Sequence, residues 1–145
     1  MNPFFFPIRI YWEDTDAGGI VYYANYLKFM ERSRTEWLRS LGVEQVQLLR
    51  EQGLMFVVVN AESQFLRPAR YGDLLEVGCE VEKWTKASLT FRQDVFRATA
   101  GEERELLVSG RVRVACLDAG KFRPKALPDD LLEIMNKESN VAGEG

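Results

Sequence analysis

The sequence contains no histidine among its 145 residues. This absence excludes the Ser-His-Asp and Cys-His nucleophile systems, in which an imidazole takes the proton of the attacking hydroxyl or thiol. It also excludes the Asp–His pairs of hydratases and removes the commonest side-chain ligand of catalytic zinc. Any chemistry of this chain therefore has to rest on carboxylates, hydroxyls, amines or backbone groups.

Cysteine is almost as scarce, with Cys79 and Cys116 as its two representatives. They lie far apart without the C-x-x-C spacing of metal or redox sites, and each falls at an apolar position of a strand-like alternation. We expect both to be buried thiols, neither nucleophiles nor disulfide partners. Such thiols are compatible with a reducing compartment.

Long hydrophobic runs and a strong net charge are also missing. No stretch approaches the roughly 20 apolar residues of a membrane-spanning helix, and the apolar residues 1–7 lack the cationic region of a signal peptide. A net charge of −3 gives no electrostatic reason to expect nucleic acid as a partner. These absences predict a soluble, cytoplasmic protein.

What is present is an ordinary globular composition, with 46% hydrophobic and 28% charged residues. The length suits one domain with a core that needs no metal or disulfide. No repeat, low-complexity block or linker divides the chain. We expect a single domain over residues 1–135 and a polar, disordered tail over residues 136–145.

The apolar pattern predicts one long helix over residues 24–41. Its apolar face centres on Met30, and Gly42 is a natural stop. The residues expected on that face are Tyr26, Leu27, Trp37, Leu38 and Leu41. A short second helix is expected over residues 44–52, and strands over residues 8–12, 55–67, 75–81, 88–98 and 106–116.

This order of elements predicts the fold class. Helices do not alternate with the strands, which argues against a parallel sheet. We expect an α+β fold in which a curved antiparallel sheet of about five strands wraps around the one long helix. Apolar residues on both sides of Val57–Val59 need a second cover, for which a partner subunit is the expected source.

Two charged residues of the long helix lie on or beside its apolar face. Arg34 projects onto that face, where a buried guanidinium needs an acidic or carbonyl partner. A structural ion pair or an interface contact is the simpler interpretation of Arg34. Glu31 lies at the margin of the face and is the better candidate for a role near a substrate.

The most informative stretch is residues 12–26, WEDTDAGGIVYYANY. Its order places Asp16 close to the start of the long helix, where free backbone N–H groups and the helix dipole favour negative charge. The same donors can polarise a carbonyl whose oxygen becomes negative during attack. A carboxylate beside such donors suits the hydrolysis of an activated acyl group. The alternative is that residues 14–16 form an Asx-type turn and a helix cap.

Two segments resemble a known family. Residues 13–26, followed by residues 29–36 (FMERSRTE), resemble the hotdog-fold acyl-CoA thioesterases of the hydroxybenzoyl-CoA thioesterase type. Residues 65–73 (FLRPARYGD) support the resemblance, which covers residues 8–128 and is greatest to the branch found beside the Tol–Pal envelope system of bacteria.

The resemblance implies a sheet wrapped around a central helix, dimers with one continuous sheet, tetramers built as dimers of dimers, and active sites at the dimer interface. By position, the catalytic carboxylate of the family corresponds to Asp16 and its carbonyl-polarising backbone N–H to Tyr23. Members near this branch often carry histidine where this chain has Tyr23. The backbone donor does not depend on that difference.

Further residues are expected to contact the substrate. Gly18 and Gly19 allow close approach of a thioester, although a plain tight turn explains them equally well. Val21, Tyr26 and Glu31 are further candidates, with packing as the simpler role of Tyr26. The phosphates of coenzyme A need cations, for which the candidates are Lys83 and Lys86 and, beyond them, Lys121, Arg123 and Lys125; an ordinary solvated surface is the alternative.

The sequence therefore predicts a homo-oligomeric acyl-CoA thioesterase that releases a free acid and coenzyme A. Asp16 is expected to act as nucleophile or general base, without a metal or a separate cofactor. The alternative is a non-catalytic module that binds acyl-CoA or acyl carrier protein. The sequence does not distinguish short, long and aromatic acyl groups.

Overall fold

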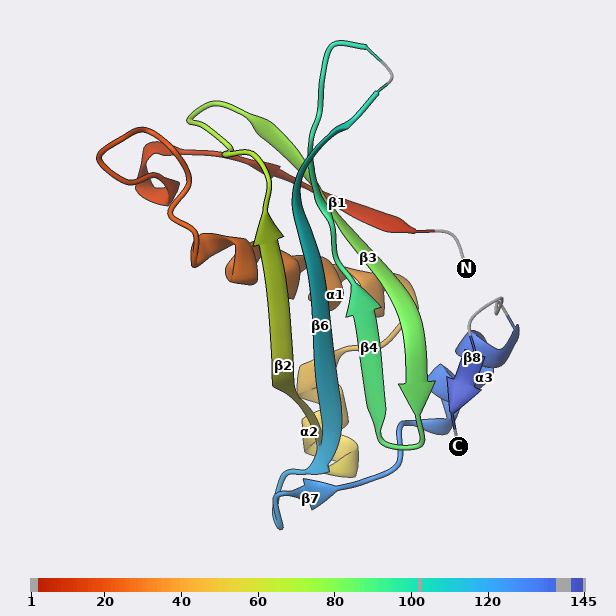
Figure 1. The fold of residues 1–145 in the computed structure, drawn as a ribbon. Coiled ribbons are helices and arrows are strands. Elements are labelled where there is room, and N and C mark those ends of the chain that lie inside the picture. Colours follow the sequence, from red (N-terminus) through yellow and green to blue (C-terminus); the bar gives the residue numbers. More distant parts are fainter. Residues whose placement is uncertain (1–2, 102, 138–141, 145) are drawn as a thin grey trace.

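The computed structural model describes residues 3–101, 103–137 and 142–144. Its elements follow the chain in an order of one strand, two helices and then a run of strands (Figure 1). They are β1 (Phe4–Arg9), the 3-10 turn η1 (Trp12–Asp14), α1 (Asn25–Ser40), α2 (Gln45–Gln52), β2 (Leu54–Phe65), β3 (Leu74–Thr85), β4 (Ser88–Arg92), β5 (Val95–Arg97), β6 (Glu105–Asp118), β7 (Arg123–Pro124), α3 (Asp129–Lys137) and β8 (Ala142–Glu144).

The strands form one curved sheet whose main path runs β1-β3-β4-β6-β2. All neighbours on this path are antiparallel. α1 crosses the concave face of the sheet, and the remaining strands are short additions to it (Figure 1). The predicted architecture, a curved antiparallel sheet around one long helix, is confirmed.

α1 packs on the sheet through the face that the periodicity predicts. It ends just before Gly42, which adopts a φ of +83° that favours glycine. Leu27 is the exception, because it is 46% exposed. Leu27 lies in the first turn of α1, at the end of the helix that extends past β2 (Figure 1). The buried residues of the helix are Tyr26, Phe29, Met30, Ser33, Trp37 and Leu38.

β2 is an edge strand. One side of β2 pairs with β6 along its whole length, and its other side has no neighbour among the described strands. Val58 and Val59, near its middle, are exposed. A long, apolar edge of this kind is a ready template for pairing with another chain.

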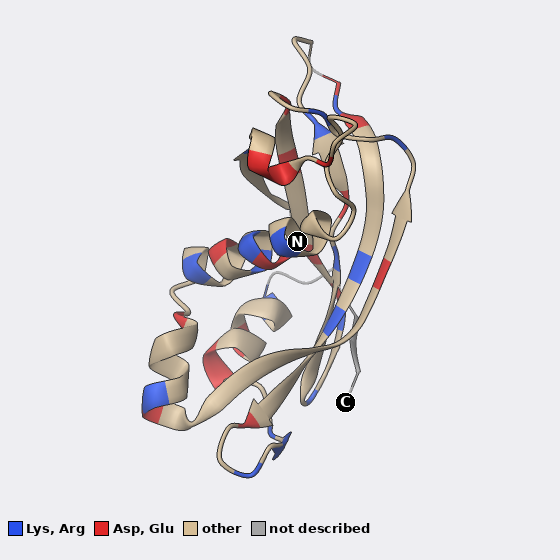
Figure 2. Cartoon of the chain, turned by 90° about the vertical axis from the view of Figure 1, so that its left-hand side faces the viewer, with Lys and Arg blue, Asp and Glu red and all other residues tan. Residues whose placement is uncertain are grey.

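Charges of both signs alternate on the solvent side of the fold (Figure 2). On α1, Arg39 pairs with Glu36 and Glu44, and on the outer face of the sheet Arg111 pairs with Glu82. These pairs place opposite charges next to each other on the helix and on the sheet. None of the helices in the described part of the chain is long and apolar enough to cross a membrane.

The structure differs from the prediction at several element boundaries. β1 begins at Phe4 and not at residue 8, and β3 continues to Thr85 beyond the predicted end at residue 81. The first strand ends at Arg9, because the Asp14 carboxylate accepts the Tyr11 N–H (2.8 Å) and curls the next residues into η1. The strand expected over residues 88–98 is interrupted between β4 and β5. In the expected tail, α3 extends to Lys137 and residues 142–144 pair with β3; residues 138–141 and 145 lie outside the described residues.

Both cysteines are buried and free, as predicted. Burial raises the pKa of the Cys79 thiol and of the Cys116 thiol above the usual value. A protonated, enclosed thiol is a poor nucleophile. The cysteines are therefore packing residues.

Candidate active site

Residues 15–21, which we call the glycine loop, form a tight hairpin closed by an antiparallel bridge between the first and last of them. Inside the hairpin the Asp16 N–H donates to the Ile20 carbonyl (2.8 Å) and the Gly19 N–H donates to the Asp16 carbonyl (3.0 Å). Gly19 has a φ of +79°, a conformation that side chains with a Cβ rarely adopt. The turn itself therefore requires glycine at position 19, and at Gly18 a Cβ would lie 3.2 Å from the Asp16 Oδ1.

The glycine loop and the start of α1 are attached to the same turn after β2. The Val21 N–H donates to the Ala69 carbonyl (2.9 Å), and Ile20 forms a bridge with Arg70. From the helix, the Tyr26 hydroxyl accepts the Ala69 N–H (3.1 Å). The segments 13–26 and 65–73, which carry the two sequence motifs, thus lie side by side and are joined by these hydrogen bonds.

Asp16 is exposed in the single chain. Its Oδ1 accepts the Gly18 N–H at 2.8 Å, which is the Asx-type turn that the sequence left open as an alternative. Its Oδ2 has no hydrogen-bond partner among the described residues. One carboxylate oxygen is thus fixed and the other is available to a substrate.

Tyr23 lies where the chain enters α1. Two nearby N–H groups are used, since Tyr22 donates to the Asp14 carbonyl (3.0 Å) and Asn25 donates to the Tyr22 carbonyl (2.9 Å), whereas the Ala24 N–H has no acceptor among the described residues. The Tyr23 N–H has no acceptor within the described ranges. It is a free donor at the positive end of a helix, as an oxyanion site requires.

An apolar groove of about 270 Å³ opens beside this donor. Phe65, at the end of β2, approaches both Tyr23 (ring centroids 6.0 Å apart) and Tyr26 (5.8 Å). Burial raises the pKa of Tyr26, so its hydroxyl stays neutral at physiological pH and accepts the Ala69 N–H. The groove is lined by Ile20, Val21, Tyr23, Tyr26, Phe65, Leu66, Arg67 and Pro68.

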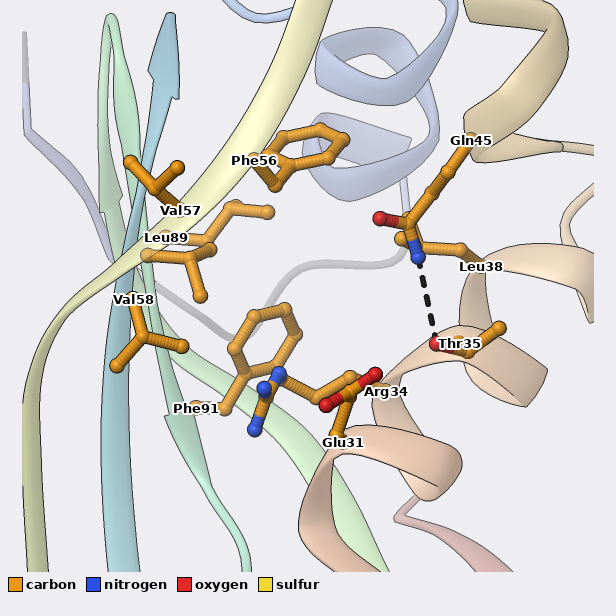
Figure 3. A pocket seen from close by; sticks show the side chains of 11 residues that line it. Glu31, Arg34, Thr35, Leu38, Gln45, Phe56, Val57, Val58, Leu89 and Phe91 are labelled. Atoms are coloured by element: carbon orange, nitrogen blue, oxygen red, sulfur yellow. Dashed lines mark hydrogen bonds between the residues drawn. The ribbon is translucent and has the colours of Figure 1, made fainter. Parts of the chain in front are cut away.

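A second cavity, of about 520 Å³, lies between α1, α2 and the inner face of the sheet (Figure 3). Glu31 and Arg34 reach into it from α1, opposite Phe56 and Val58 of β2. This cavity is distinct from the groove at Tyr23, so Glu31 does not share a pocket with Tyr23 or Tyr26 within one chain.

Arg34 has a structural partner of a different kind from the predicted ion pair. Its Nη1 donates to Oε1 of Gln93 at 2.8 Å, and no carboxylate of the described residues lies within 4 Å of it. Burial lowers the pKa of Arg34, while Cys79 and Glu31 act in the opposite direction. Of the two kinds of partner expected for a buried Arg34, an acidic group or a carbonyl, the structure thus supplies the carbonyl, as the side-chain amide of Gln93.

Lys83 and Lys86 do not lie near Asp16 in a single chain. Lys83 belongs to β3 and Lys86 to the β3–β4 turn, at the end of the sheet away from the glycine loop (Figure 1). The predicted strand ended at residue 81, whereas β3 continues to Thr85 and therefore includes Lys83. Lys83 and Lys86 could act together with Asp16 only if Asp16 belonged to a neighbouring subunit. The binding of coenzyme A phosphates by these lysines stays a prediction.

Two features of this region were not predicted. The first is that Phe65 and Leu66 line the groove. Two adjacent apolar residues that are exposed at the end of a strand would have indicated a binding surface. Trp12 and Tyr71 stack face to face beside the glycine loop, with ring centroids 3.9 Å apart and planes 10° apart. Trp12 lies next to one recognised motif and Tyr71 lies within the other. The sequence alone does not indicate their contact, because the fold brings the two motifs together.

Comparisons with known proteins agree with this arrangement. The sequence pattern of the thioesterase-like superfamily matches residues 10–135. Acyl-CoA thioesterase YbgC of Haemophilus influenzae is 45% identical over 130 residues, which cover 90% of this chain and 92% of that protein.

Solved structures agree as well. A probable thioesterase from Bartonella henselae has a TM-score of 0.77 and 33% identity, covering 88% of this chain and all of that chain (100%). The 4-hydroxybenzoyl-CoA thioesterase of Pseudomonas sp. strain CBS-3 has a TM-score of 0.83 and 24% identity, covering 92% and 99%. At that identity the likeness concerns the fold, which is the hotdog fold.

Proposed function

The chain belongs to the thioesterase-like superfamily, and from this premise we propose that it hydrolyses acyl-CoA thioesters to a free acid and coenzyme A. The observation that supports the proposal most is local. Asp16, with one carboxylate oxygen free among the described residues, belongs to the glycine loop, whose Ile20 and Val21 line the apolar groove together with Tyr23, the residue that carries the unpaired N–H. This pairing supplies an attacking or proton-accepting oxygen and an oxyanion donor.

In the proposed reaction, the thioester carbonyl oxygen accepts the Tyr23 N–H, which stabilises the negative charge that develops there. In one route Asp16 attacks the carbonyl carbon, the C–S bond breaks, coenzyme A leaves as the thiolate, and water hydrolyses the mixed anhydride. In the other, Asp16 takes a proton from the water that attacks. Both routes give the same products, and both are proposed to need no metal or cofactor.

The substrate contacts follow from the same geometry. Gly18 and Gly19 leave room for the thioester, and Val21 and Tyr26 form the wall of the groove. Glu31 is proposed to contact the acyl group from the larger cavity. Because the two pockets are separate in one chain, this contact requires a second subunit.

A homodimer paired along β2 meets that requirement. Antiparallel pairing of two β2 edges would extend the sheet and place Phe65, at the groove, beside the half of the partner's strand that carries Phe56, at the larger cavity. Each active site would then contain the glycine loop of one chain and the Glu31 cavity of the other. Two such dimers are proposed to form a tetramer.

The test is thiol release from a panel of acyl-CoAs and from acyl carrier protein, with Asp16→Asn as the diagnostic variant. Asparagine can keep the hydrogen bond to Gly18, so we expect a folded protein whose kcat falls by about 10³-fold or more. Asp118→Asn is the matched control, because Asp118 accepts the Gly120 N–H in the same type of turn, also at 2.8 Å.

The control variant should keep full activity. Unchanged turnover by Asp16→Asn would remove Asp16 from the mechanism. Binding of acyl-CoA without any thiol release by the natural chain would instead identify a non-catalytic binding module. Retained activity after dialysis against a chelator is expected, and its loss would contradict the metal-free mechanism.

A further inference from the structure

Arg97, the last residue of β5, uses all three nitrogens of its guanidinium group. Nη1 donates to Asp73 Oδ2 (2.6 Å), Nη2 donates to the Pro68 carbonyl (3.2 Å) and Nε donates to Glu105 Oε1 (3.0 Å). The side chains of Arg97 and Asp73 are each 21% exposed, so this ion pair is partly enclosed. A planar guanidinium that binds three acceptors holds them in a set geometry.

Two of these acceptors belong to one turn, which joins β2 to β3. Pro68 lies near its start and Asp73 closes it, since Asp73 Oδ2 also accepts the Arg70 N–H (2.8 Å) and the Asp73 N–H donates to the Arg70 carbonyl (3.0 Å). Arg97 lies 24 positions beyond Asp73 in the chain. Its guanidinium group therefore clamps residues 68–73 from a different strand.

The same turn is the anchor of the candidate active site. Between its two ends, the backbone of Ala69 makes one hydrogen bond to the glycine loop and one to the first turn of α1. Asp16 lies in that loop and Tyr23 lies at that helix start. No hydrogen bond or ion pair of the described residues joins Arg97 to Asp16 or Tyr23, so an effect of Arg97 on them has to pass through the turn.

A second ion pair extends this link to the wall of the groove. Glu105 binds Arg97 through Oε1 and accepts Nη1 of Arg67 at Oε2 (2.9 Å). Hydrogen bonding from Arg67 and Arg97 lowers the pKa of Glu105 below its usual value. Arg67 lines the groove beside Tyr23. A chain of alternating charges, formed by Arg67, Glu105, Arg97 and Asp73, thus connects the groove wall with the end of the turn.

We propose that Arg97 is a positioning residue for thioester hydrolysis, because its guanidinium group holds the turn 68–73 where the turn fixes Asp16 relative to the Tyr23 N–H; this inference rests on the function proposed above. The backbone of β5 pairs with β3 and β6, so the sheet does not depend on the Arg97 side chain. The guanidinium group sets where the turn lies on the sheet. Displacing a reacting group by about 1 Å costs about 10²-fold in rate.

The experiment measures acyl-CoA hydrolysis by Arg97→Met, which keeps the apolar stem and removes the guanidinium group. We expect kcat to fall about 10²-fold. KM should change by less than about threefold, because Arg97 lines neither the groove nor the larger cavity. The pH profile of kcat should keep its shape, since Arg97 does not contact the carboxylate that reacts.

Arg104→Met is the matched control. Arg104 lies just before β6 and pairs with Glu76 of β3 at 3.1 Å, and it makes no hydrogen bond to the turn 68–73 among the described residues. This variant also removes an arginine–carboxylate pair, but it leaves the anchor of the glycine loop intact. Its kcat and KM should equal those of the natural chain.

Arg97→Lys tests the geometry of the clamp. A lysine keeps a cation for Asp73, but its ammonium group cannot reproduce the fork that binds Pro68 and Glu105 as well. We expect partial recovery, with kcat about tenfold below that of the natural chain. If Arg97→Met does not fold, Arg97→Lys provides the test.

The Trp12–Tyr71 stack reports on the turn without any substrate, because Tyr71 belongs to the turn and Trp12 lies outside it. The difference in near-ultraviolet circular dichroism between the natural chain and Trp12→Phe identifies the signal of the stacked rings. This signal should weaken in Arg97→Met and stay unchanged in Arg104→Met. A signal that stays unchanged in both variants would show that Arg97 does not hold the turn.

Four kinetic results would overturn the proposal. They are a natural kcat in either folded Arg97 variant, an equal loss of kcat in Arg104→Met, a loss confined to KM, and a shifted pH profile, which would show that Arg97 acts on the reacting carboxylate by its charge. Absence of thiol release by the natural chain is a different outcome. It would overturn the proposed function, whereas the signal of the stack would still show whether Arg97 holds the turn.

Discussion

Gln93 shows how single polar residues fix the helix in this fold. Its side chain is fully buried, and Nε2 donates to the carbonyls of Met30 (2.9 Å) and Gly78 (3.2 Å). Its Oε1 accepts a guanidinium N–H of Arg34. Together with the hydrogen bond from Ser33 to the Val77 carbonyl, these contacts fix where α1 sits on the sheet.

Replacing Gln93 with leucine should therefore destabilise the protein. The variant leaves the Arg34 guanidinium without its acceptor in a partly buried site, so we expect a loss of about 2–3 kcal/mol in the free energy of unfolding. Urea denaturation measures the loss. Gln47→Leu, on the exposed side of α2, should change stability by less than about 0.5 kcal/mol; similar losses in both variants would contradict a role for the buried amide.

At the scale of single residues, the sequence predicted the site residues that lie close together in the chain. Asp16 and Tyr23 belong to one short stretch, so the turn and the helix start determine their relation. Phe65 and Tyr71 join them only through the packing of the second motif against the first. The hydrogen bond between Arg34 and Gln93 spans 59 positions of the chain, and no local pattern indicates it.

Among the elements, β3 and β6 are linked across β4 on the outer face of the sheet. Arg111 binds both carboxylate oxygens of Glu82, at 2.6 and 2.8 Å. Hydrogen bonding from Arg111 lowers the pKa of Glu82 below the usual value. Ionised Glu82 is therefore more favourable in the folded chain than in the unfolded chain.

This shift has a definite sign in stability measurements. Because the folded-state pKa is depressed, the contribution of Glu82 is present above about pH 4.3 and is lost as the pH falls through the folded-state pKa. Glu82→Gln should be less stable at pH 7 by less than about 1 kcal/mol, since the pair is partly exposed. Urea denaturation at pH 7 and pH 3.5 should show that the difference shrinks in acid.

Glu51→Gln is the comparison for this experiment, because Glu51 is an exposed glutamate of α2 without an ion pair within the described ranges. Its stability difference should be small at both pH values. A Glu82→Gln deficit that stays constant between them would show that the charge of Glu82 contributes nothing beyond its shape.

The sequence predicted α1 and most strands because the periodicity of each is set by one buried face, and it predicted α2 with its end at Gly53. It did not predict the break between β4 and β5. There the Gly78 N–H donates to the Asp94 carbonyl (2.8 Å) and the Gln93 N–H donates to the Gly110 carbonyl (2.9 Å). Bonds to two neighbouring strands cause this irregularity, so residues 88–98 alone do not indicate it.

At the scale of the whole molecule, the described strands leave β2 as a long open edge, and the cavity of about 520 Å³ lies beside it. We expect Val59→Lys to weaken self-association, because it places a charge at the centre of the proposed interface. Light scattering over a range of concentrations measures the change. Val46→Lys is the matched control, since Val46 is 59% exposed on α2 and Val59 is 52% exposed.

The control should assemble as the natural chain does. If Val59→Lys assembles equally well, the subunits do not pair along β2. If the natural chain is monomeric and still hydrolyses acyl-CoA, the site needs no second subunit, and Glu31 has no route to the acyl group.

The hydrogen bond between Gly18 and Asp16 has one consequence for the timing of the reaction. It stops the carboxylate from rotating while the groove is still empty, so the free oxygen has a set direction before any thioester arrives. The entropy of that alignment is lost during folding, and substrate binding does not have to order the group again. In the proposed reaction the free carboxylate oxygen of Asp16 is thus oriented before the substrate binds.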